Sequence, residues 1–508
     1  MTTSLPSGVP RPRVQVVLVG LSLSLLLAVP GQHAASAATV INVNEFAESA
    51  TFSDHKHPPA AGATILDVSN HNGKCSLREA VEAVNTHLAV DGCPAGTGDD
   101  RIVLPPGEYG VEAPLALTAM ATVSGANTGT DGRSATRGPE TIVKFVSNPS
   151  PDFPAALFQL TGAGAGSVFD GLALRGQLNP DDPHEPVYGI DSYVAAPVRG
   201  FTVRNSTFKD FTCALCDLGG SDMLVERNDF LGELVGGDPN SGVFGNAIYG
   251  DFPASNLVVQ DSRFAGYSNA DVIEATATTS LTGFTVRRNT MRDDSGLAVL
   301  TRGANQVSIT DNWITADPVT PGVRGIIISD ANVGVDVSHN TITNQTSGLR
   351  VRKDVDASPS SVDVHVHGNR VYGNAEAINI SAGSLPLSLD ATGNWWGANA
   401  GIGGVGGTGQ RVNGITGPAS LVDASSPLQL AVPCPAQGVI GTPAPLTAGV
   451  AGMPTALTAL AHFGANWPGA AAPADPIYTG TAAGGSVAGF PSYVTGSSSP
   501  VIGGTVAG

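Results

Sequence analysis

The chain has 508 residues, of which 13% are charged, and it contains 64 glycines and 36 prolines. Its formal net charge of −18 disfavours a polyanionic partner, so we expect no binding to nucleic acid. Few charged residues together with abundant Gly, Thr, Val, Asn and Asp argue against a mainly helical protein and favour β-structure with tight turns.

Residues 1–37 are predicted to be an export signal. Arg11 and Arg13 supply positive charge, residues 14–29 are almost wholly apolar, and residues 35–37 (Ala-Ser-Ala) offer small side chains for cleavage. A membrane anchor is the alternative, but the apolar run is shorter than the roughly 20 residues that span a bilayer. We therefore expect a secreted or cell-surface-associated protein that is monomeric and not inserted in the membrane.

A helix is predicted over about residues 76–88. Ser76 and Glu79 have the spacing of a capping box, in which each side chain satisfies a backbone donor at the helix start. An apolar face then recurs at helical spacing. Its members are Leu77, Val81, Val84 and Leu88.

Two cysteines flank this predicted helix. Because an exported protein meets an oxidising compartment, we expect a Cys75–Cys93 disulfide. Residues 100–109 follow, and they predict a strand, a Pro-Gly turn and a second strand.

The run Cys75-Ser76-Leu77-Arg78-Glu79-Ala80 resembles the CSLREA module found at the start of many secreted bacterial β-helix proteins. The resemblance covers about 45 residues and includes the motif letters themselves. It implies an all-β fold downstream, a right-handed parallel β-helix, with the short α-helix plugging its open N-terminal end. It implies no catalytic role for Arg78 or Glu79.

A repeat runs from about residue 168 with the pattern apolar, two residues, Asn or a small residue, one residue, apolar. Successive Asn or Ser positions lie 22 to 34 residues apart, a period typical of a solenoid. We expect these Asn residues to tolerate left-handed backbone angles at turns and to form an amide ladder between coils about 4.8 Å apart. The copies are Val203–Phe208, Val225–Phe230, Val259–Phe264, Val286–Met291, Ile309–Ile314, Val337–Ile342, Val366–Val371 and Ala391–Trp396, with a weaker copy at Val168-x-x-Gly171-x-Ala173.

The last copy, Gly393-Asn394-Trp395-Trp396-Gly397, resembles the NWWG signature that closes many such helices. We expect the two Trp side chains to cover the C-terminal end of the core, with stacking on a sugar as the alternative. Residues 421–428 fit a final strand. The predicted domains are the signal (1–37), the CSLREA-type cap (38–110), the β-helix (111–432) and a low-complexity tail or truncated β-sandwich (433–508).

One sheet face is the candidate functional surface. A strand follows most turn Asn residues by about eight residues, and its middle residue is expected to point inward and the next residue outward. The predicted outward column is Cys216, Tyr249, Glu274, Ala298, Ile327, Arg350 and Asn379, with Asp251, Arg302, Asp330, Arg352 and Lys353 at neighbouring outward positions.

The chain resembles pectate-lyase-like β-helix enzymes in architecture, and in those enzymes the glycan groove lies on such a face. The resemblance implies that carboxylates there could bind calcium or act as acid and base, and that Lys or Arg could abstract a proton. The candidate catalytic residues are Glu274, Arg350, Lys353, Asp251, Asp330, Arg302 and Arg352. Their arrangement matches no known lyase or polygalacturonase motif.

Metal and cysteine chemistry has further candidates. His365 and His367 face the same way on a strand, as metal ligands or as ordinary surface residues. Cys213 and Cys216 are expected to form a local disulfide, or one of them to pair with Cys434. Calcium could bind the inserted loop 176–198; its candidate ligands are Asp181, Asp182 and Glu185, with His184 and Asp191 nearby and Asp293-Asp294 as a weaker site. No other cofactor is expected.

Two functions remain open from the sequence. The first is a non-enzymatic protein that binds polysaccharide or a cell-surface glycan, favoured by the strong structural repeats and the lack of a catalytic motif. The second is a lyase or glycoside hydrolase that uses the column around Glu274, Arg350 and Lys353. Both share one fold, and the fold does not decide between them.

Overall fold

The computed structural model describes the body of the chain. Residues 1–37, interpreted as an export signal, lie outside the described residues, as does nearly all of 433–508. No helix within the described ranges is long and apolar enough to cross a bilayer. The ranges are 38–46, 73–111, 113–145, 155–164, 166–176, 187–192, 198–232, 245–250, 254–267, 271–292, 297–316, 322–353, 360–381, 389–397, 401–402, 415–417 and 419–428, with short strands β34 (Thr481–Ala482) and β35 (Gly485–Ser486).

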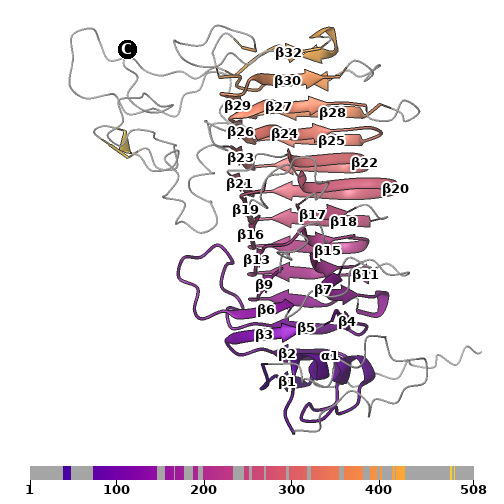
Figure 1. Ribbon diagram of the computed structural model, residues 1–508. Helices are drawn as coiled ribbons and strands as arrows, with labels where there is room; N and C mark the ends of the chain where they lie inside the picture. Colours follow the sequence, from indigo (N-terminus) through magenta and orange to yellow (C-terminus); the bar gives the residue numbers. More distant parts are fainter. Residues whose placement is uncertain are drawn as a thin grey trace, which may run out of the picture. The chain divides into compact units, whose positions relative to one another are not determined.

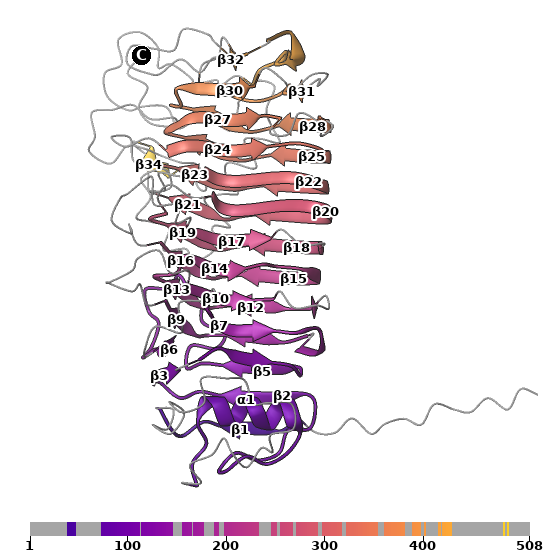
Figure 2. The same cartoon turned by 45° about the vertical axis from the view of Figure 1, so that its right-hand side comes forward.

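The described body is a right-handed parallel β-helix, which confirms the predicted fold. Each coil contributes strands to three faces, and each strand pairs in parallel with the equivalent strand of the next coil (Figures 1 and 2). Stacking is required because strands this short cannot bury an apolar side within their own coil.

Strands β20 and β22 each run from the first face directly into the second. The first face is the stack of parallel strands in which these two long strands begin. Its members are β4 (Leu115–Leu117), β7 (Ala155–Leu160), β10 (Val187–Asp191), β14 (Cys213–Cys216), β17 (Asn246–Gly250), the starts of β20 (Asp271–Arg287) and β22 (Leu297–Thr310), β24 (Gly322–Ile328), β27 (Gln345–Val351), β30 (Glu376–Ile380) and β32 (Ile415–Thr416).

The second face contains β1 (Val40–Asn42), β2 (Asp100–Val103), β5 (Ala121–Ser124), β8 (Val168–Asp170), β11 (Val198–Arg199), β12 (Thr202–Arg204), β15 (Gly220–Glu226), β18 (Ala254–Gln260), the ends of β20 and β22, β25 (Val333–Ser338), β28 (Val362–His367), β31 (Leu389–Asp390) and β33 (Val422–Asp423). The third face contains β3 (Gly107–Val111), β6 (Thr141–Phe145), β9 (Ala173–Arg175), β13 (Thr207–Lys209), β16 (Asp229–Leu231), β19 (Arg263–Ala265), β21 (Thr290–Arg292), β23 (Trp313–Thr315), β26 (Thr341–Thr343) and β29 (Arg370–Tyr372).

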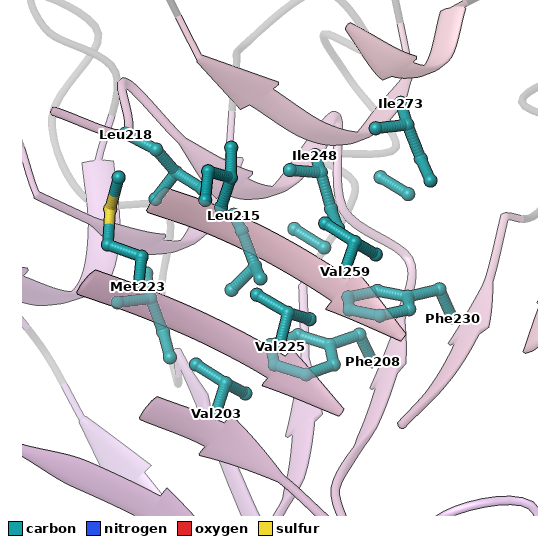
Figure 3. Packing of buried hydrophobic residues seen from close by; sticks show 14 of the residues in the cluster. Val203, Phe208, Leu215, Leu218, Met223, Val225, Phe230, Ile248, Val259 and Ile273 are labelled. Atoms are coloured by element: carbon teal, nitrogen blue, oxygen red, sulfur yellow. The ribbon is translucent and has the colours of Figure 1, made fainter. Parts of the chain in front are cut away.

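The core lies between the three faces. Figure 3 shows Val225 of the second face, Phe208 and Phe230 of the third and Leu215 and Ile248 of the first converging on one interior. Equivalent residues stack from coil to coil: the Phe208 and Phe230 ring centroids lie 4.7 Å apart, close to the spacing of neighbouring strands. The buried apolar column is therefore continuous along the stack.

Turn side chains between the second and third faces form the predicted ladder. Asn312 N–H donates to Asn340 Oδ1 (2.9 Å), and Asn340 N–H donates to Asn369 Oδ1 (2.8 Å). Asn369 N–H continues the series to Asn394 Oδ1 (2.8 Å), and these Asn side chains are fully buried. The Asn residues are thus structural.

The left-handed position of this turn is one residue earlier than predicted. The residue before each ladder position carries the positive φ, for example Arg288 (53°), Asp311 (56°) and His339 (58°). The later coils place Gly368 (66°) and Gly393 (64°) there, the residue type that adopts this conformation at least cost. The ladder Asn is selected for its amide group rather than for its backbone angle.

The weak first copy of the repeat was also misplaced by one residue. Phe169, not Val168, pairs with Val203, and Leu174, not Ala173, pairs with Phe208. Both possible registers place apolar residues at these two positions, so the pattern alone could not distinguish them.

Helix α1 (Leu77–Thr86) plugs the N-terminal end, as predicted (Figure 2). Ser76 and Glu79 form both halves of the capping box. The helix ends two residues before the predicted boundary because His87 adopts a left-handed conformation, so Leu88 lies beyond the helix and is 52% exposed rather than on its apolar face.

Polar contacts tie the cap to the first coils, and a disulfide joins the two segments that flank helix α1 within the cap. Arg78 donates to the carbonyl oxygens of Ala113 (2.6 Å) and Pro114 (3.2 Å), a structural role. Cys75 and Cys93, both buried, form the predicted disulfide.

The C-terminal end is closed by the two tryptophans. Trp396 belongs to the hydrophobic core, and Trp395 is 7% exposed. The guanidinium of Arg370 lies over the rings of Trp395 (5.1 Å) and Tyr372 (4.5 Å). Burial of both indoles agrees with the closing role rather than with sugar stacking. Of the predicted strand over residues 421–428, only Val422–Asp423 (β33) forms a strand; Leu421 ends a 3-10 turn (Ala419–Leu421), and residues 424–428 continue without strand structure.

Candidate functional site

The first face presents an outward column close to the predicted one. Ile248, Ile273, Ile326 and Leu349 point inward as expected. In the coil of β22, however, Val299 pairs with Ile273, so the outward residue is Leu300 and not Ala298. The run from Leu297 to Leu300 is apolar throughout, and alternation could not fix its register.

The predicted acid and base of this column lie far apart along the stack. The register runs from Glu274 through Leu300 and Ile327 to Arg350, three coil steps or about 14 Å. Leu300 and Ile327 are buried although they occupy outward positions. Glu274 instead accepts a hydrogen bond from Asn246 Nδ2 (3.1 Å).

The other candidates of this face are dispersed. Asp330 lies at the corner after β24 and is 1% exposed, so its carboxylate is not presented to solvent as a ligand-binding group would be. Arg302 and Arg352 are half-buried, and Lys353 lies just beyond β27. Asp251 lies outside the described residues.

The structure describes the predicted cysteine pair but only one of the acidic residues named in the loop 176–198. Asp191 ends strand β10 rather than lying in an inserted loop, and it pairs in register with Cys216. Cys213 and Cys216 form a local disulfide within β14. Asp181, Asp182, His184, Glu185, Asp293, Asp294 and Cys434 lie outside the described residues.

A polar cluster on the last coils of this face was missed by the sequence analysis. Its centre is Glu376, whose Oε2 accepts from Ser347 Oγ (2.8 Å) and Asn379 Nδ2 (2.8 Å). Glu376 Oε1 accepts from Thr416 Oγ1 (2.8 Å). Arg350 donates from Nη2 to Ser381 Oγ (3.2 Å) and is near enough for its charge to act on Glu376. Three successive coils, β27, β30 and β32, thus contribute to one site.

The carboxyl of Glu376 is held in its ionised form. Partial burial raises the pKa of Glu376, but hydrogen bonds from Ser347, Asn379 and Thr416, together with the Arg350 charge, more than offset this and leave the pKa below its ordinary value. The cluster therefore combines a fixed anion, a guanidinium, an amide and several hydroxyl groups.

A second cluster lies on the second face. His365 and His367 project from β28, and Asp390 of β31 pairs in register with His365. Side-chain atoms of these three residues lie within 4.8 Å of one another. The sequence identified both histidines but not Asp390, which is one coil further along the chain.

Comparison with known proteins gives distant structural likenesses. No protein-family model matches the chain, and no curated protein matches it by sequence. The chain is similar to the alginate lyase AlyF-OU02 in complex with G6 (12% identity, TM-score 0.34, 64% of this chain and 82% of that one). It is also similar to a PL6 alginate lyase in complex with a trisaccharide (11%, 0.37, 77% and 88%) and to tailspike protein 3 of bacteriophage CBA120 (14%, 0.32, 73% and 55%). The chain's own coils define its class: a right-handed parallel β-helix with a plugged N-terminal end.

Proposed function

We propose that the protein binds polysaccharide or a cell-surface glycan outside the cell, without cleaving it, through the outward face of β27, β30 and β32. The observation that carries the proposal is the Glu376 cluster. Arg350, Asn379 and the neighbouring hydroxyl groups are the donors and acceptors that a glycan recognises, and successive coils present them along a line. Such a row suits an extended chain of sugar residues.

The protonation state of Glu376 supports binding over catalysis. A general acid must carry a proton at the working pH, and a general base is most effective with a pKa near that pH. Glu376 has a lowered pKa and both its oxygens accept hydrogen bonds, so it suits neither task. Arg350, as a guanidinium, keeps its proton.

The extracellular location is part of the proposal. It is supported by the export-signal pattern of residues 1–37 and by two disulfides, a bond type that persists in oxidising compartments. A monomer without a required cofactor is the simplest form of such a protein.

A polysaccharide lyase or glycoside hydrolase is the second candidate. The observation in its favour is that an acidic and a basic group, Glu376 and Arg350, meet on one sheet face.

One experiment separates the two functions. Purified protein is run in affinity gels containing neutral and acidic polysaccharides, and the same mixtures are assayed for reducing ends and unsaturated products, with and without calcium. We expect retardation by at least one glycan, no products, and at least tenfold weaker binding for Arg350→Ala. Arg287→Ala, which removes the same charge from the second face, should bind normally. Products abolished by Arg350→Ala would establish the enzyme instead, and the absence of binding to any glycan would count against the proposal.

A further inference from the structure

We propose that His365, His367 and Asp390 form a zinc site on the second face, bridging the coils of β28 and β31. Asp390 Oδ2 lies 3.5 Å from His365 Nδ1 and 3.3 Å from His367 Nε2. A tetrahedral Zn²⁺ with bonds of about 2.0–2.1 Å holds its ligand atoms about 3.3 Å apart. Both His–Asp distances already match that spacing, and the ligand atoms of all three residues lie within 4.8 Å of one another. A small approach of the two imidazoles would therefore let one ion contact all three side chains.

Hydrogen bonds around the cluster direct ligand lone pairs toward a common point. Thr392 O can only accept a hydrogen bond, so His367 Nδ1, 2.9 Å away, carries the proton and Nε2 presents its lone pair. His365 Nε2 lies 2.9 Å from Asp363 Oδ1, which favours a proton on Nε2 and leaves Nδ1 directed toward Asp390. A carboxylate or carbonyl partner on the distal nitrogen is the usual support of a metal-bound imidazole.

Asp390 is oriented in the same way. Its Oδ1 accepts from the backbone N–H (3.2 Å) and hydroxyl (2.9 Å) of Thr392, which leaves Oδ2 as the atom that faces both imidazoles. Three electron-rich atoms therefore converge at one place. Their mutual repulsion is relieved by a cation there or by protonation of the imidazoles.

The fold generates this arrangement. Alternation places His365 and His367 on one side of β28, and parallel pairing sets Asp390 directly opposite His365. The same column continues with Asp336 on one side and Asp423 on the other, which adds negative potential around the site. The three side chains are 38–46% exposed, so an ion reaches them from solvent and keeps an open coordination position.

The alternative is a set of exposed ion pairs between protonated histidines and Asp390. Zinc titration of the full, tag-free chain by isothermal calorimetry at pH 7.5 separates the two. We expect the His365→Ala/His367→Ala double variant to lose one zinc equivalent that the parent chain binds. Asp390→Ala should weaken this equivalent at least tenfold, and Asp363→Asn, which keeps all three ligands, should weaken it about 10–100-fold.

Controls keep the result specific. His339→Asn removes another histidine of the same stack that lies 3.8 Å from Asp311, and it should leave the zinc isotherm unchanged. Calcium, which prefers oxygen ligands, should not displace the zinc. Circular dichroism in EDTA verifies that each variant is folded. Equal zinc binding by the parent chain and the double variant would overturn the proposal, as would parent binding no tighter than millimolar.

Discussion

The side chain of Asn312 shows how single residues join the coils. Its Nδ2 donates to Val286 O (2.8 Å) and Asn340 Oδ1 (2.9 Å), and its Oδ1 accepts from the N–H (3.0 Å) and Nδ2 (3.1 Å) of Asn289. Asn289, Asn312 and Asn340 are fully buried, so water cannot replace a missing partner.

We expect Asn312→Ala to lower the free energy of unfolding by about 2–3 kcal/mol, because it leaves buried donors of the neighbouring coil unsatisfied. Urea unfolding followed by circular dichroism measures this. Asn305→Ala, at a partly exposed position of β22, the strand that leads into this turn, should cost less than about 0.5 kcal/mol. Equal effects of the two substitutions would show that the ladder contributes no special stability.

The lowered pKa of Glu376 predicts that this residue contributes to stability in a pH-dependent way. Because its pKa is lower in the folded protein than in the unfolded chain, its stabilisation is present above the unfolded value of about 4.3 and is lost as the pH falls through the folded value. Glu376→Gln should therefore lower the melting temperature at pH 7, and the difference from the parent chain should shrink toward pH 3. A difference that stays constant from pH 7 to pH 3 would contradict this role.

Between β5 and β6, the loop of residues 125–140 reaches along the turns of later coils (Figure 1). Gly132 N–H donates to Arg227 O (2.8 Å), and Arg137 donates to Asn205 O (2.7 Å). A Cβ at Gly132 would lie 2.4 Å from Ser206 O, so no larger residue fits at this contact.

Gly132→Ala should lift this loop from the turns, at a cost of about 1–3 kcal/mol typical of overpacking. Thermal melting measures the cost, and limited proteolysis should show faster cleavage within 125–140. Gly138→Ala is the matched control, because its Cβ would meet only Asn127 Oδ1 at 3.5 Å. Identical cleavage rates for both variants would argue against the loop contact.

The elements that carry repeating signals were predictable from the sequence. Local sequence patterns were sufficient to predict the capping box at Ser76 and the ladder at Asn312 and Asn340. Patterns failed where apolar residues were continuous, as from Leu297 to Leu300, because both registers bury an apolar side chain. The left-handed backbone of His339, the residue before Asn340, was also not predicted, because a His in this conformation has no sequence signature.

The candidate sites depended on contacts between coils, which spacing alone does not give. Glu376 lies two residues before the inward Ile378, at a position outside the aligned triplets. Asp390 lies 25 residues after His365, and only the register of β28 and β31 brings them together. The export signal and the loop around Asp181 remain predictions.

At the scale of the whole molecule, the covering of its two ends determines whether the stack of coils stays monomeric. An open end would expose apolar core and unpaired strand edges. Helix α1 with the Cys75–Cys93 disulfide covers one end, and Trp396 closes the other.

The two disulfides should differ in their contribution to stability. Cys75 and Cys93 are separated by 18 positions, which gives about 3 kcal/mol on the chain-entropy model, whereas the separation of three between Cys213 and Cys216 gives about 1.5 kcal/mol. The Cys75→Ser/Cys93→Ser variant should therefore melt at a lower temperature than Cys213→Ser/Cys216→Ser. The reverse order would show that the cap disulfide does not contribute more to stability than the local disulfide of β14.

The most direct test of the binding account is hydrogen–deuterium exchange with and without a saturating glycan from the affinity panel. We predict slower exchange in the backbone of β27 and β30, residues 345–351 and 376–380, and no change in β25 or β18 on the second face. Unchanged exchange in β27 and β30, with protection elsewhere in the chain, would contradict the assignment of the glycan-binding surface to the Glu376 cluster.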